Sequence, residues 1–148
     1  MLTAAAGLLL LGTAPMAWQR WLAPPWGEVT AQVMAGCDLH QGACRATFPD
    51  GSAVELALAP RPIPDDAAIT LRLRTADFTP RSVDVDLNGE TMNMGPNRTE
   101  LTPVGEGEWS GSTALNACVT GRMTWVLSVR AKVGGGVRVA RFRFEVGH

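Results

Sequence analysis

The residues best suited to chemistry are sulfur-containing and lie in two short segments, Met92-Asn-Met94 and Cys118 to Met123. On an extended chain, residues two apart project to the same side about 7 Å from each other, so Met92 and Met94 would face one ion. Thioether and thiolate sulfurs are soft donors that select Cu(I) over hard cations. The pattern predicts a Cu(I) site formed by Met92, Met94 and Cys118, with Met123 as a further ligand.

Two tryptophans are candidates to cover such an ion through the face of the indole ring. Trp109 precedes the Cys118 segment, and Trp125 lies two residues after Met123 and would share its strand face. Met123 and Trp125 would approach Met92 and Met94 if their two segments are neighbours. In the alternative interpretation the methionines are packing residues, because methionine fills irregular cores. The Gly, Pro and Asn residues around Met92 favour a loop, where core filling is less natural.

The chain has three cysteines. Cys37 and Cys44 enclose a short polar stretch that a disulfide would close into a small loop. Cys37, His40 and Cys44 could instead bind metal, but structural zinc sites use four ligands and closer cysteine spacing, which favours the disulfide. Cys118 then remains as a free thiol in a compartment where disulfides form, and this supports a role as a ligand.

The N-terminal segment is apolar, and residues 1–18 contain no charged side chain. This span is short for a transmembrane helix but long for the apolar part of a signal peptide. Three tryptophans follow at the position of an interfacial aromatic belt: Trp18, Trp21 and Trp26. We expect residues 1–26 to form a membrane anchor, with a cleaved signal as the alternative, and residues 27–148 to form one domain.

From residue 27 onward, apolar and polar residues alternate with a period of two, as in strands that bury one face. The apolar sets are Val54/Leu56/Leu58, Ile69/Leu71/Leu73, Val83/Val85/Leu87 and Trp125/Leu127/Val129. Turn residues separate these runs at sandwich-like spacing. The sequence therefore predicts an all-β fold, an immunoglobulin-like β-sandwich of seven or eight strands.

Two further predictions concern charge pairs between strands and the alternation of apolar residues in the last strand. Arg72/Arg74 and Asp84/Asp86 have opposite charges and are expected to pair across neighbouring strands on the wet face. In the last strand the apolar set shifts from Val137/Val139 to Ala140/Phe142. A phase shift of one residue is typical of a β-bulge.

Composition excludes several classes of function. The 13 basic and 14 acidic residues are scattered, so the chain has no basic stripe for nucleic acid. It has no nucleophile elbow, no phosphate-binding loop, no Cys-x-x-Cys motif and only two histidines, of which His148 is the last residue. Most enzyme mechanisms need a residue that is missing, so we expect a protein that is not an enzyme.

The sulfur-containing segments also resemble a known family. The order Met92-x-Met94-Gly95, Gly107-x-Trp109-x-Gly111 and Cys118-x-x-Gly121-x-x-x-Trp125 is similar to YtkA-like domains and, more loosely, to FixH-type proteins. The resemblance covers about residues 69 to 131. It implies an immunoglobulin-like domain after one N-terminal anchor, with a role in copper handling and respiratory oxidase assembly.

The carried-over residues are Met92, Met94, Gly95, Gly121 and Trp125. The chain differs from the family in having Asn97 and Arg98 where a histidine is expected, and Cys118 where a methionine is usual. Without the histidine, Cu(II) loses its ligand, and Cys118 compensates for Cu(I) only.

These observations lead to one hypothesis and two rivals. The hypothesis is a periplasmic Cu(I)-binding or copper-delivery protein, anchored as a single-pass protein of the bacterial inner membrane, whose partner is a respiratory oxidase or a copper-handling protein. The first rival is a metal-free immunoglobulin-like module that docks on a membrane complex. The second rival, a small-ligand binder, has no support in the sequence beyond the fold.

Overall fold

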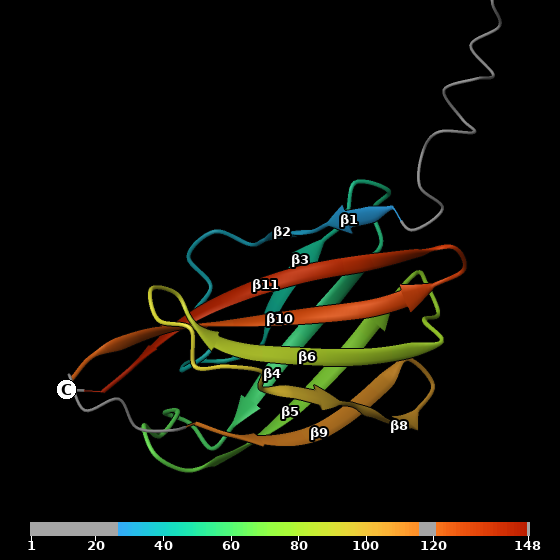
Figure 1. Cartoon of the computed structure of the whole chain (residues 1–148). Coiled ribbons are helices and arrows are strands. Elements are labelled where there is room, and N and C mark those ends of the chain that lie inside the picture. The colour runs from blue at the N-terminus through green and yellow to red at the C-terminus, as the bar shows by residue number, and fades with distance from the viewer. Residues whose placement is uncertain (1–26, 116–120, 148) are drawn as a thin grey trace, which may run out of the picture.

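The computed structural model describes residues 27–115 and 121–147, which form two packed β-sheets (Figure 1). The strands are β1 (Glu28–Thr30), β2 (Gln32–Val33), β3 (Cys44–Thr47), β4 (Ala53–Ala59), β5 (Ala68–Ala76), β6 (Ser82–Gly89), β7 (Arg98–Glu100), β8 (Thr102–Gly105), β9 (Glu108–Ala114), β10 (Met123–Val133) and β11 (Gly136–Val146). One sheet has five strands in the order β1-β11-β10-β6-β7, and the other has six in the order β2-β3-β4-β5-β9-β8. The predicted all-β sandwich is confirmed.

The strand number exceeds the expected seven or eight because the sheet edges are formed by very short strands. The four edge strands are β1, β2, β7 and β8, with three, two, three and four residues. Strands of this length are too short to show a period of two in the sequence. Short edges also leave little unpaired backbone for contacts with other chains.

The predicted apolar faces form the core between the two sheets. Ile69, Leu71 and Leu73 of β5 are at most 1% exposed, and the corresponding residues of β4, β6 and β10 are buried in the same way. The expected pairing of Arg72/Arg74 with Asp84/Asp86 is wrong, because β5 and β6 belong to different sheets. Asp84 instead lies 3.3 Å from the Arg98 Nε of β7.

The predicted β-bulge in β11 is also wrong. The strand pairs with β10 in one unbroken antiparallel register from Met123↔Val146 to Val133↔Gly136. The apparent phase shift arises because Arg138 occupies a position on the inner face, two residues before Ala140. Its guanidinium lies over the rings of Phe48 and Phe78, so a charged residue fills a core-facing position.

Several loops gather at one end of the sandwich, at the left of Figure 1, and we call residues 37–44, 88–97, 121–124 and 145–147 the methionine end. Met123 is paired with Val146 there, and the Glu90 amide donates to the Thr124 carbonyl at 2.9 Å. The β10–β11 turn lies at the opposite end. Within the described residues no helix is long and apolar enough to cross a membrane, and the predicted anchor, residues 1–26, lies outside them.

Candidate functional site at the methionine end

The loop that carries Met92 and Met94 is organised by Asn88, the penultimate residue of β6. The Asn88 Oδ1 accepts hydrogen bonds from the amides of Gly89, at 3.0 Å, and Met94, at 2.7 Å. Its Nδ2 donates to the carbonyl of Gly95 at 3.2 Å and to Oδ1 of Asn93 at 3.3 Å. The side-chain amide of Asn88 therefore pairs with the backbone amide of Met94 and with the carbonyl of Gly95. These hydrogen bonds give a defined shape to a loop that has no strand hydrogen bonds.

Met123 reaches this loop because Gly89 has no side chain. A Cβ atom built on Gly89 would lie 2.1 Å from the Met123 Cε and 2.6 Å from the Met92 carbonyl oxygen. The Met123 methyl group and the Met92 backbone thus lie against the same side of Gly89. The structure brings the start of β10 and the end of β6 together, as the copper hypothesis requires of these segments.

The two loop methionines are at the surface. The exposed fractions of Met92 and Met94 are 43% and 36%, whereas Met123 is partly buried against the core. An exposed thioether beside a fixed backbone can bind a soft ion and release it by ligand exchange, because no core packing must be broken. The sulfur-rich loop is therefore accessible and not part of the closed core.

The predicted tryptophan caps have different surroundings. Trp125 is 2% exposed and paired with Gly89 across β10 and β6, on the same inner face as Met123. Trp109 lies at the other end of β9, in the six-stranded sheet. Thr113, near the end of β9, contacts the loop: its Oγ1 donates to the Asn97 Oδ1 at 3.3 Å. The structure therefore brings Trp125 to the site but not Trp109. Cys118 lies outside the described residues.

The predicted disulfide is present between Cys37 and Cys44, whose Cα atoms are 5.7 Å apart. Both sulfurs are bonded to each other, so the alternative metal site of Cys37, His40 and Cys44 is not formed. The enclosed loop places Leu39, which is 1% exposed, into the core at the methionine end. The disulfide therefore closes a loop whose Leu39 side chain covers the core at this end of the sandwich.

His40 fastens the same loop to two distant segments. Its Nε2 lies 2.5 Å from the carbonyl oxygen of Glu145 in β11, and its Nδ1 accepts a hydrogen bond from the Ile63 amide at 3.0 Å. These partners require the neutral ring with the proton on Nε2, because a backbone carbonyl only accepts and an amide only donates. Both ring nitrogens are occupied, which leaves neither free as a metal ligand.

Conventional metal ligands do not gather in this part of the molecule. Across residues 27–115 and 121–147, no three His, Cys, Asp or Glu side chains are grouped closely enough to hold a metal ion. A metal at the methionine end would therefore depend on thioether sulfur. This is a donor set for Cu(I) and not for Zn²⁺ or Ca²⁺.

Comparisons with protein-family models, with curated proteins and with solved structures found no match. The resemblance to YtkA-like and FixH-type domains remains a prediction.

Three residues position the site in ways that the sequence did not indicate: Asn88, Gly89 and His40. Asn88-Gly89 is a common hairpin-turn pair, so these residue types indicate a turn. They do not indicate the hydrogen bonds of the Asn88 side chain or the space that Gly89 leaves for Met123. His40 stood out only beside the two cysteines. Its real partners are backbone groups of Ile63 and Glu145, which are distant in the chain and have no sequence signature.

Proposed function

We propose that this protein binds Cu(I) through Met92, Met94 and Met123 and delivers it to a partner. The observation that carries the proposal is the contact at Gly89, where the Met123 methyl group and the Met92 backbone meet below an exposed loop. Cys118 lies five residues before Met123 in the chain, and the sequence predicts it as a ligand together with Met92 and Met94.

The chemistry of transfer follows from the donor set. Thioethers are neutral and soft, so they hold Cu(I) without the strong attachment that several thiolates would give. The exposed position of Met92 and Met94 lets an incoming ligand of the recipient replace them one at a time. The protein would act as a carrier with no turnover chemistry.

The cellular setting is part of the same proposal. We assign the sandwich to the immunoglobulin-like class, and residues 1–26 to an anchor in the bacterial inner membrane that leaves residues 27–148 in the periplasm. The Cys37–Cys44 disulfide supports an oxidising compartment, since such bonds are rare in the reducing cytoplasm. The recipient would be a respiratory oxidase or another copper-handling protein.

A metal-free docking module is the second candidate, and the same exposure favours it. Met92 and Met94 are among the few large apolar side chains at the described surface, and exposed methionines also serve as contact residues in interfaces. In that case the ordered loop would contact a membrane complex directly.

A Cu(I) titration distinguishes the two. The full chain in a mild non-ionic detergent is titrated against a competing Cu(I) chelator, and the double variant Met92→Ala/Met94→Ala is compared with Met34→Ala. Met34 is the matched control because it is 59% exposed but follows β2, which belongs to the other sheet from β6. We expect one-to-one binding that the double variant loses and Met34→Ala keeps. Equal competition by all three chains, or none, contradicts the copper proposal and leaves the docking module.

A further inference from the structure

Side chains on the outer face of the six-stranded sheet form rows across the strands, and one row is balanced in charge. Following the register from β3 to β9, it contains Arg45, Glu55, Arg74 and Glu108. The signs alternate across these strands. Arg74 donates from Nε and Nη2 to the Glu108 Oε1, at 3.1 and 2.9 Å.

The next row along the strands is different. Arg72 of β5 has Ala57 of β4 on one side and Ser110 of β9 on the other. Neither neighbour has a charge or the length to cover an arginine. Arg72 is exposed, and no carboxylate of residues 27–115 or 121–147 lies within ion-pair distance of it. The small neighbours leave both its stem and its guanidinium open above the sheet.

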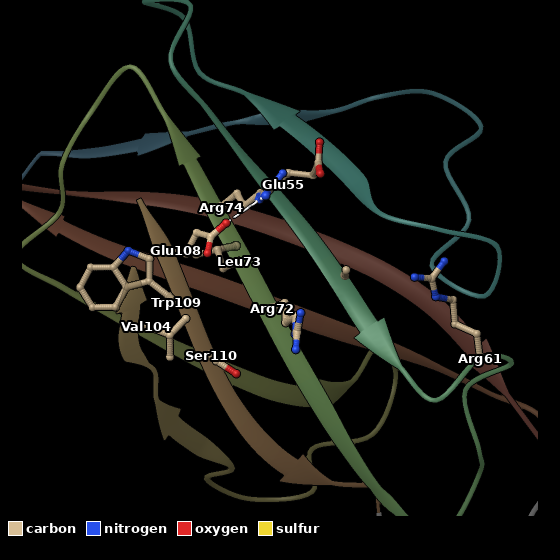
Figure 2. Close-up of a pocket in the computed structure, with 10 residues that line it drawn as sticks. Glu55, Arg61, Arg72, Leu73, Arg74, Val104, Glu108, Trp109 and Ser110 are labelled. Carbon is tan, nitrogen blue, oxygen red and sulfur yellow. Dashed lines mark hydrogen bonds and ion pairs between the residues drawn. The ribbon is translucent and has the colours of Figure 1, made fainter. Parts of the chain in front are cut away.

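The surface around Arg72 is hollowed into a groove of about 550 Å³ (Figure 2). Val104, which is 60% exposed, lies on one side of the groove. Trp109 borders the same side, but it is only 9% exposed, because its ring packs in the core on the inner face, opposite Leu73. Arg61, from the loop after β4, lies on the other side, where its Nη1 donates to the Gln41 carbonyl at 3.1 Å. The groove therefore has the apolar Val104 on one side, a free guanidinium in the middle and a second cation opposite. Its volume is within the range of small-molecule sites, about 300–1,000 Å³.

We propose that this groove binds a small monocarboxylate with an apolar arm. The planar guanidinium of Arg72 offers two parallel N–H donors that match a carboxylate, and Arg61 adds positive charge on the same side. The arm of the ligand would lie toward the exposed Val104. Figure 2 shows Glu55 beyond Arg74, away from Arg72. A second carboxylate on the ligand would be repelled by the negative charge of Glu55, which favours a ligand with one carboxylate. The proposal is independent of the copper site.

The test is an NMR titration of the full chain in non-ionic detergent, observing the arginine Nε–H signals and the backbone amides of β4, β5 and β9. The probes are 3-phenylpropionate, its neutral amide, and acetate, which lacks the apolar arm. We expect saturable shifts with a dissociation constant of about 1 mM or tighter for 3-phenylpropionate, and at least about tenfold weaker binding of the other two.

Variants separate a built site from general attraction of anions. Arg72→Gln is expected to weaken 3-phenylpropionate binding about tenfold or more. The control is Arg45→Gln, which removes the same charge from the balanced row. Because both arginines are exposed, both variants are expected to fold, and their melting temperatures check this. The proposal is overturned by an absence of saturable shifts, by tight binding of the neutral amide, or by equal losses in the two variants.

Discussion

The Arg138 guanidinium forms an ion pair with the carboxylate of Asp50, with 2.9 Å between Nη1 and Oδ2, and joins β11 to the β3–β4 turn. The same group lies 5.3 Å from the centre of the Phe48 ring and 5.0 Å from that of Phe78. Its Nη1 also donates to the hydroxyl of Ser52. One arginine thus closes the end of the sandwich opposite the methionine end.

Replacing this arginine should destabilise the fold. In Arg138→Ala the two rings lose their cation and the space above them is emptied, so we expect the free energy of unfolding to fall by about 2 kcal/mol. Urea denaturation measures the change. Arg141→Ala is the matched control, because that side chain is 43% exposed and its ion pair with Glu28 is at the surface, where such pairs contribute little. Equal effects of the two substitutions would contradict the role assigned to Arg138.

The same cluster predicts a pH dependence. Hydrogen bonds from the side chain and the backbone of Ser52, followed by the bond from Arg138, lower the pKa of Asp50 from 3.8 to about 2. A carboxyl group whose pKa is lower in the folded chain stabilises the fold above its unfolded pKa, and the effect is lost as the pH falls through the folded pKa. The stabilisation should therefore be complete above about pH 4 and disappear toward pH 2.

Asp50→Asn tests this linkage. The variant should lose the part of the pH dependence that falls between pH 4 and 2, as measured by urea denaturation across that range. Asp77→Asn, in the β5–β6 loop, serves as a control for the general effect of removing a carboxylate. A slope that is the same in the wild type and in Asp50→Asn would show that the ion pair is not coupled to folding.

Gly89→Ala should disturb the methionine end specifically. The new methyl group would meet the Met123 Cε at 2.1 Å and the Met92 carbonyl oxygen at 2.6 Å, and the second contact is with backbone. We expect a loss of about 1–3 kcal/mol in stability, as for other overpacked sites. Shifts of the amide signals of residues 88–97 would locate the disturbance. Gly27→Ala, which meets nothing within 4 Å, should leave stability and spectrum unchanged.

His40→Ala should weaken the attachment of the disulfide loop. The substitution leaves the Ile63 amide without its acceptor and the Glu145 carbonyl without its donor. Because Ile63 is 5% exposed, we expect a cost of about 1–3 kcal/mol. Thermal unfolding measures it, with Gln41→Ala on the same exposed loop as control. Faster hydrogen exchange at Ile63 in His40→Ala would confirm the site of the change, and unchanged exchange would contradict it.

Much of the fold follows from local pattern. Alternation in β4, β5, β6 and β10 correctly assigns the buried faces, since side chains point to opposite sides at successive strand positions. The same rule fails in β11, because a guanidinium stacked on two rings and paired with Asp50 can occupy an inner position. Hydrophobicity alone does not reveal such a position, so the sequence suggested a bulge.

For the candidate site too, the sequence indicated one part and only the fold shows the rest. The types and spacing of Met92, Met94 and Cys118 suggested a soft-metal site with Met123 as a further ligand. The alternation put Met123 and Trp125 on one face. Only the fold shows that Gly89 makes room for the Met123 methyl group, that Asn88 shapes the loop and that Trp109 lies elsewhere. These relations depend on which strands are neighbours.

The sequence by itself determined that the chain forms strands, which faces they bury and which two cysteines form the disulfide. Each of these depends on residues close together in the chain. The tertiary structure decided how the strands are distributed between two sheets, and therefore that Arg72 and Arg74 do not meet Asp84 and Asp86. It also decided that Arg72 is left between Ala57 and Ser110. The physical reason is that strand pairing is made by backbone hydrogen bonds, which carry no residue identity, so the partner of a strand is chosen by the packing of the whole core.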